Sequence, residues 1–144
     1  MTSKNIASLA FALVLLGEPA AAAEKVVVIV NAKNAQTLTA ADVKNIYNDN
    51  VITWSNGARI STYDLPAKAE ARETFSQKIL GGSARDAATE WANKKITNTA
   101  KNPPATKSES VVVNSVAKDE DAIGYVPASA AAGKEGIRVI LTLE

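Results

Sequence analysis

Runs of apolar residues alternate along the chain with segments of helical periodicity, and this alternation predicts the fold class. Lys25–Val30 is a nearly continuous β-branched run, typical of a strand buried on both faces, as in a parallel sheet. Further strands are expected at Ile60–Tyr63, Ala122–Val126 and Ile137–Leu143. Strands that alternate with helices predict an α/β domain with a mostly parallel or mixed sheet flanked by helices.

Capping residues mark the first two predicted helices. Thr39 followed by Asp42 is a variant of the capping box, so a helix should begin there and run to about Tyr47. A second helix is expected from Ala67 or Lys68 to Leu80, because Gly81-Gly82 follows in the position that favours a helix end.

The second half of the chain predicts two more helices and one long loop. Ser83 can cap a helix whose apolar side is Ala87, Ala88, Trp91 and Ile96, which predicts that Trp91 lies in the core. Thr97–Lys107 contains Pro103-Pro104 and many polar residues, and is the predicted mobile loop. The next helix spans Glu109–Lys118, and Gly124 in the strand after it allows close approach to the backbone.

The first residues resemble a signal peptide. Lys4 is followed by the apolar run Ile6–Leu16, and Ala21-Ala22-Ala23 offers the small residues that signal peptidase reads. The run is too short to span a bilayer, which needs about 20 apolar residues. We therefore expect cleavage after Ala23, a periplasmic or secreted product without a membrane span, and one domain at residues 24–144.

Composition excludes several function classes. The sequence has no Cys and no His, so Ser-His-Asp and Cys-His catalysis and Cys/His zinc sites are excluded. A net charge of +1 from 16 basic and 15 acidic residues gives no footprint for nucleic acid. The carboxylate pair Glu70 and Glu73 and the run Asp119–Asp121 lack the spacing of a calcium loop. We expect a non-enzymatic protein with no metal and no cofactor.

Five segments, in order and at plausible spacings, resemble motifs of phosphate-type periplasmic solute-binding proteins. They are Asn31–Asn34 after the first strand, Leu38–Tyr47, Val51–Trp54, Arg72–Phe75 with Ile79–Gly81 after it, and Ala122–Val126. The resemblance implies a type II periplasmic-binding-protein fold. Full-length members have two lobes that close on an oxyanion and deliver it to an ABC importer, and this chain resembles the short relatives with a single lobe.

The resemblance also implies where an anion would bind. The family's phosphate loop reads approximately Gly-Ser-Gly-Thr-Arg, and the matching residues here are Lys68, Ala69, Glu70, Ala71 and Arg72. Arg72 is kept, but the hydroxyl residues are replaced by alanines and Glu70 adds a negative charge. Since hydroxyls and backbone amides at a helix N-terminus hold phosphate, we expect weak binding or none.

Aromatic residues supply the remaining candidates. Trp54, beside a turn, could stack on a ligand, and Tyr125 lies at a strand end, where ligands of open α/β sheets sit. The alternatives are a solvated helix face for Lys68 and Arg72 and simple packing for Tyr125. Two functions stay open: capture of phosphate or another small oxyanion for an ABC importer, or a sensor or interaction module that meets another periplasmic protein.

Overall fold

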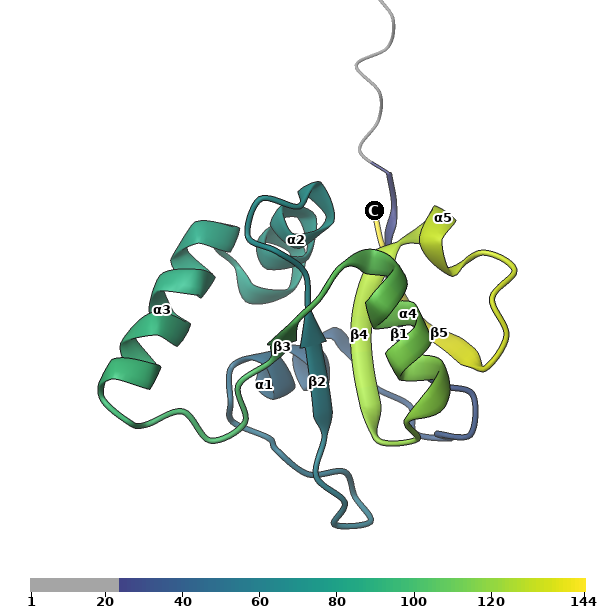
Figure 1. The fold of residues 1–144 in the computed structure, drawn as a ribbon, viewed down its shortest axis with the longest axis horizontal. Coiled ribbons are helices and arrows are strands. Elements are labelled where there is room, and N and C mark those ends of the chain that lie inside the picture. The colour runs from purple at the N-terminus through teal and green to yellow at the C-terminus, as the bar shows by residue number, and fades with distance from the viewer. Residues whose placement is uncertain (1–23) are drawn as a thin grey trace, which may run out of the picture.

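A computed structural model describes residues 24–144 (Figure 1). The predicted signal peptide, residues 1–23, lies outside the described residues. Within them, five strands form one sheet in the order β3-β2-β4-β1-β5. The strands are β1 (Val26–Asn31), β2 (Ser61–Asp64), β3 (Ala105–Thr106), β4 (Ala122–Pro127) and β5 (Ile137–Leu143). The helices are α1 (Ala40–Tyr47), α2 (Glu70–Phe75), the π-helical turn η1 (Ser76–Leu80), α3 (Ala84–Ile96), α4 (Glu109–Lys118) and α5 (Ala128–Ala131).

The sheet is mixed, which confirms the predicted α/β class. β2 runs parallel to β3 and β4, whereas β1 is antiparallel to both of its neighbours, β4 and β5. Every residue of β1 is buried, as predicted, but the expectation that this burial indicates parallel pairing is wrong for β1. A continuous apolar run indicates that both faces of a strand are covered. It does not determine the direction of the neighbouring strands.

One face of the sheet is covered by α4, which spans the residues expected from the sequence. A Cβ added to Gly124 of β4 would lie 2.6 Å from Val112 Cγ1 of α4. The glycine therefore permits close packing of the helix on the strand, as the sequence predicted. Val112 and Val116 are fully buried at this contact.

An aromatic cluster fills the opposite side of β4. Tyr125 stacks on Phe75 with ring centroids 3.9 Å apart and an interplanar angle of 2°. Tyr47 meets both rings edge-on, at 4.7 Å from Phe75 and 5.8 Å from Tyr125. Because such pairs add to the free energy of burial, the cluster joins α1, α2 and β4 into one core.

The predicted helix boundaries hold with one shift. Thr39 and Asp42 form both bonds of the capping box at α1, and Ser83 accepts from the Asp86 N–H at α3. The helix expected from residue 67 or 68 begins at Glu70 and continues through the π-helical turn to Leu80. Gly81 ends it in the left-handed conformation, with φ of 81°.

The core position predicted for Trp91 is wrong. Within α3 only Ala84 is buried; Trp91 is partly exposed, and Ile96 is 82% exposed. In Figure 1 the helix stands at the margin of the molecule, away from the sheet. Its apolar stripe consists mainly of alanines, which offer little area to bury, so the helix stays at the surface.

The long polar segment Thr97–Lys107 contains the short strand β3. Hydrogen bonds to the Asp49 carboxylate hold this segment in place. The Asp49 carboxylate accepts from the backbone N–H groups of Lys101 (2.7 Å) and Asn102 (2.8 Å). Asn102 in turn donates to Ile60 O at 2.8 Å. No helix within residues 24–144 is long and apolar enough to cross a membrane.

Candidate binding site

Three helices begin at one edge of the sheet. β2, β3 and β4 are parallel, so their carboxyl ends share this edge, and α2, α4 and α5 start beyond it at Glu70, Glu109 and Ala128. In open α/β sheets ligands bind at this edge, and helix N-termini attract anions there. The fold thus places the predicted loop Lys68–Arg72 where the family resemblance expects an anion.

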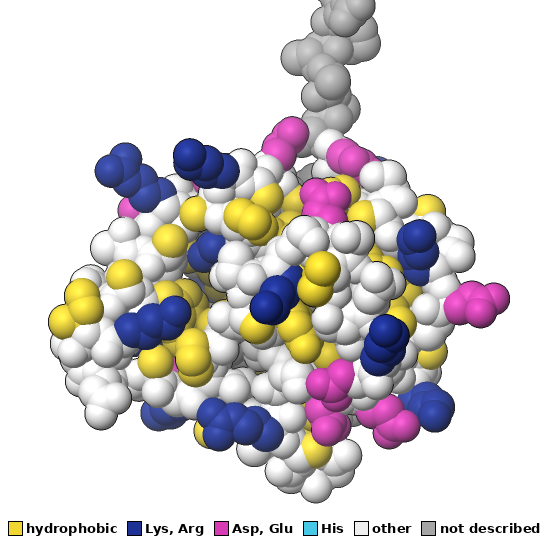
Figure 2. All heavy atoms as spheres, in the orientation of Figure 1, with side chains coloured by type: hydrophobic (Ala, Val, Ile, Leu, Met, Phe, Trp, Pro, Cys, Tyr) yellow, Lys and Arg dark blue, Asp and Glu magenta, His cyan; other side chains and the backbone are white. Residues whose placement is uncertain are grey.

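The side chains around this edge are acidic. A groove of about 170 Å³ at the start of α2 is lined by Glu24, Glu70 and Glu109, together with Ala71, Thr74 and Pro127. Among these described lining residues there is no Lys or Arg. Figure 2 shows acidic side chains gathered at the end of the molecule where the described chain begins. Three carboxylates oppose the attraction that helix N-termini exert on an anion.

Glu24 already occupies one of the backbone donors at this edge. Its Oε1 accepts from the Ser129 N–H at 2.7 Å, and hydrogen bonding to Ser129 lowers the pKa of this carboxyl. A carboxylate of the chain itself therefore caps α5, in the manner of an anion at a helix N-terminus.

The predicted anion loop is divided between surface and interior. Lys68 and Glu70 are exposed, Ala69 is partly buried and Ala71 is buried. Ala69 caps α2 without a side-chain hydrogen bond, and its carbonyl accepts from the N–H groups of Arg72 and Glu73. Alanine at positions 69 and 71 therefore provides no side-chain donor on either side of Glu70.

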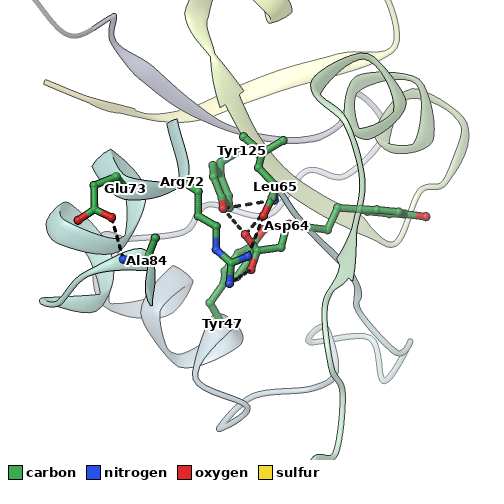
Figure 3. A network of polar contacts seen from close by, with 8 residues as sticks. Tyr47, Asp64, Leu65, Arg72, Glu73, Ala84 and Tyr125 are labelled. Atoms are coloured by element: carbon green, nitrogen blue, oxygen red, sulfur yellow. Dashed lines mark hydrogen bonds and ion pairs between the residues drawn. The ribbon is translucent and has the colours of Figure 1, made fainter. Parts of the chain in front are cut away.

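Arg72, the last residue of the predicted anion loop, points into the protein (Figure 3). The residue is only 6% exposed. Its Nη1 donates to Leu65 O at 2.8 Å, and its Nη2 lies 3.4 Å from Asp64 Oδ2. The guanidinium therefore already pairs with one carboxylate of the chain.

Asp64, at the end of β2, is the centre of this polar network. Its Oδ1 accepts from the Leu65 N–H at 2.9 Å and from the Tyr125 hydroxyl. Burial raises the pKa of Asp64, and its bonds to Tyr125, Arg72 and Leu65 oppose that shift. Burial, followed by the nearby Asp64 charge, raises the pKa of Tyr125. Both tyrosine hydroxyls of the core are bonded, since Tyr47 donates to Tyr63 O at 2.6 Å.

The two aromatic candidates are internal. Trp54 is 4% exposed, and its indole N–H donates to Asp121 O at 2.9 Å, at the end of β4 remote from α2. Tyr125 is fully buried. In this conformation neither side chain presents a surface to a ligand. The structure brings Arg72 and Tyr125 together through Asp64, and ligand contacts by the loop and by both aromatic residues stay a prediction.

Three residues of the site, Glu24, Asp64 and Glu109, were not predicted as site residues from the sequence. Asp64 directly follows the predicted strand Ile60–Tyr63, and the rule that ligand-edge residues follow strands could have identified it. Glu109 begins the predicted helix Glu109–Lys118, but an acidic residue in a first helical turn is common for the helix dipole alone. Only the three-dimensional arrangement places Glu109 beside Glu70.

Comparisons of sequence and of structure give different results. No protein-family model matches the chain, and no curated protein matches it. Solved structures do match. An ABC-type phosphate transport receptor from Vibrio cholerae aligns with a TM-score of 0.62 at 16% identity, over 81% of this chain and 45% of the receptor.

Two further solved structures align with this chain to a similar extent. One from Clostridium perfringens, described as a phosphate ABC transporter substrate-binding protein with bound phosphate, has a TM-score of 0.63 at 17% identity, over 81% of this chain and 44% of that one. PstS from Borrelia burgdorferi has a TM-score of 0.63 at 12% identity, over 81% of this chain and 46% of PstS. The chain spans less than half the length of these proteins, and it has the fold of one lobe of a phosphate-type solute-binding protein.

Proposed function

We propose that this chain is an exported, non-catalytic binding module that has lost tight phosphate binding and meets a basic surface of another periplasmic protein through the acidic edge of its sheet. The observation that carries the proposal is the groove at the start of α2, where Glu24, Glu70 and Glu109 converge and which Arg72 does not line. Export rests on the predicted cleavage after Ala23.

Phosphate binding at this edge is disfavoured on two grounds. The groove carries three carboxylates, and like charges close together oppose binding of a phosphate dianion. A single lobe also leaves its ligand open to water on one side, where solvent competes for each hydrogen bond. The chain spans less than half the length of the matched phosphate-binding structures, and within the described residues a ligand at this edge meets one lobe only.

The chemistry of the edge instead suits a cationic surface. Complementary charge steers association and fixes the orientation of partners. Glu70 and Glu109 are exposed, so lysine or arginine side chains of a partner can reach both without displacing the core. The solved neighbours are named as phosphate transport components, and an ABC importer is therefore one candidate partner.

A defined basic peptide tests this proposal. We expect a lysine-rich peptide to shift the backbone resonances of Glu70 and Glu109 in ¹H–¹⁵N spectra of residues 24–144, and the shifts to shrink as salt is raised. The double variant Glu70→Gln with Glu109→Gln should weaken this binding. Glu135→Gln, which removes an exposed carboxylate elsewhere, is the matched control. Shifts that spread over all acidic residues alike, or equal losses in both variants, would argue against the proposal.

Weak oxyanion capture is the second candidate function. The observation that favours it is the convergence of three helix starts on one edge, with Arg72 kept in the motif position. Restoring the family pattern through Ala69→Ser, Glu70→Gly and Ala71→Thr should then strengthen phosphate binding at least about tenfold, equivalent to about 1.4 kcal/mol. A restored variant that still binds no phosphate would count against this candidate and leave the interaction module.

A further inference from the structure

A second groove lies between α3 and the β2–β3 margin of the sheet. Its volume is about 230 Å³. Strand ends, helix and loop all contribute to its lining, which consists of Asp64, Arg72, Ala88, Trp91, Ala92, Lys95, Pro103, Pro104 and Thr106. None of the residues around the acidic groove at the start of α2 belongs to it, so the two grooves are separate.

Part of the wall of this groove is apolar. Trp91, partly exposed on α3, faces the groove together with Pro103 and Pro104 of the following loop. Lys94 Nζ lies 4.8 Å from the centroid of the Trp91 ring and donates to Asn48 O at 3.1 Å, which limits the movement of the indole. An aromatic ring and two prolines in one groove suit a flat, apolar ligand body.

The inner part of the groove is formed by two buried, charged side chains. Asp64 and Arg72 line it, and each is more than nine-tenths buried. A guanidinium has five N–H donors. The described contacts of Arg72 are one hydrogen bond to Leu65 O and the ion pair with Asp64, so donors remain for a further acceptor. Asp64 is held by Leu65 and Tyr125 and stays in place beside it.

The rim carries a second positive charge. Lys95, exposed on α3, also lines the groove. The charged lining residues are therefore two cations, Arg72 and Lys95, and one anion, Asp64. In Figure 2 basic and hydrophobic side chains are interspersed on the side of the molecule where α3 lies. A site with a partly apolar wall, a buried guanidinium and a lysine at its rim selects a monoanion with an apolar body.

We propose that this groove binds a small monocarboxylate with a ring-sized apolar body. The ring lies against Trp91 and the two prolines, and the carboxylate accepts from Arg72 and Lys95. The groove is smaller than the ~300–1,000 Å³ typical of sites for drug-sized ligands, which restricts the ligand to about one ring. The proposal uses neither Glu70 nor Glu109, so it does not depend on the partner binding proposed at the acidic groove.

The two tryptophans provide a site-specific test. In ¹H–¹⁵N spectra the indole N–H of Trp91 reports on the groove, and that of Trp54, which is buried and bonded to Asp121, is an internal control. Benzoate is the probe, benzamide its neutral counterpart and inorganic phosphate the anion without an apolar body. We expect a saturable shift of the Trp91 signal with benzoate, with Kd near ~1 mM, and an unmoved Trp54 signal. Neither benzamide nor phosphate should reproduce it.

Substitutions test whether benzoate binding depends on the positive charge of Lys95 and on the Trp91 ring. Lys95→Ala should weaken benzoate binding at least about threefold, because it removes one of two cationic partners, and Trp91→Ala should abolish it in calorimetry. Lys78→Ala, an exposed lysine on η1 away from the groove, should leave Kd unchanged. The proposal is overturned by an absence of saturation up to about 20 mM benzoate, by equal binding of benzamide, or by equal effects of Lys95→Ala and Lys78→Ala.

Discussion

Replacing Arg72 with Met should destabilise the protein strongly, because the guanidinium is part of the interior. The substitution removes the hydrogen bond to Leu65 O at 2.8 Å and the ion pair with Asp64 at 3.4 Å. An unpaired buried carbonyl costs about 1–3 kcal/mol, and breaking a buried ion pair by removing one partner costs about 3–5 kcal/mol. Because Asp64 keeps its bonds to Leu65 and Tyr125, we expect a loss of about 3 kcal/mol in the free energy of unfolding.

Urea unfolding followed by circular dichroism measures this loss. With a slope of about 1.5 kcal/mol per molar urea, typical of a small domain, the midpoint should fall by about 2 M. The double variant Asp64→Asn with Arg72→Met is the control, and it should lose less than the sum of the two single losses, because no buried charge is left unpaired. A loss below about 1 kcal/mol for Arg72→Met would refute the reasoning, since an exposed arginine, free to meet an anion, gives a change of that small size.

Three further predictions concern packing and pH. Trp54→Ala should destabilise by about 3–5 kcal/mol, whereas Trp91→Ala should cost about 1 kcal/mol because its side chain is partly exposed; denaturant melts that rank them in reverse order would contradict the assigned burial. Gly124→Ala should cost about 1–3 kcal/mol, since its Cβ would meet Val112 at 2.6 Å, and a neutral effect in the same melts would mean that α4 lies further away. Burial raises the pKa of Asp64 above 3.8, so the folded state holds the carboxyl proton more tightly than the unfolded state does. The stability that this proton contributes is therefore lost as pH rises through the raised pKa. Thermal melts from pH 4 upward should show this decline in stability, and Asp64→Asn should flatten it.

Much of the fold was predictable because local patterns determined it. The capping box at Thr39, the glycine end at Gly81 and the β-branched run Val26–Val30 each specify an element through the backbone bonds or packing they require. The close approach at Gly124 followed from its missing side chain. Such signals depend on neighbouring residues in the chain, and these are visible in a sequence.

Strand direction and the burial of single aromatic residues were not predictable in the same way. β1 is apolar throughout whether its neighbours are parallel or antiparallel, so its direction follows from the tertiary arrangement. Trp91, predicted for the core from a helical stripe, is partly exposed, and Trp54, beside a turn, is buried. What decides this burial is whether another element packs on the ring, and only the assembled fold determines that.

The candidate site, like the fold, was only partly predictable from the sequence. The family resemblance predicted an anion loop at Lys68–Arg72 and weak binding there because hydroxyl residues are missing. It did not show that Arg72 turns inward to Asp64, because the two residues are joined through space across the end of β2. Nor did it show that Glu24 and Glu109 flank Glu70, since the three come from distant parts of the chain.

The measurement that tests the central claim most directly is calorimetric titration of residues 24–144 with inorganic phosphate at low ionic strength, with sulfate and buffer alone as references. With carboxylates around the start of α2, we predict no saturable heat, or a Kd of about 1 mM or weaker. A saturable signal with a micromolar Kd would contradict the account, because it would require a phosphate site that the acidic edge does not provide.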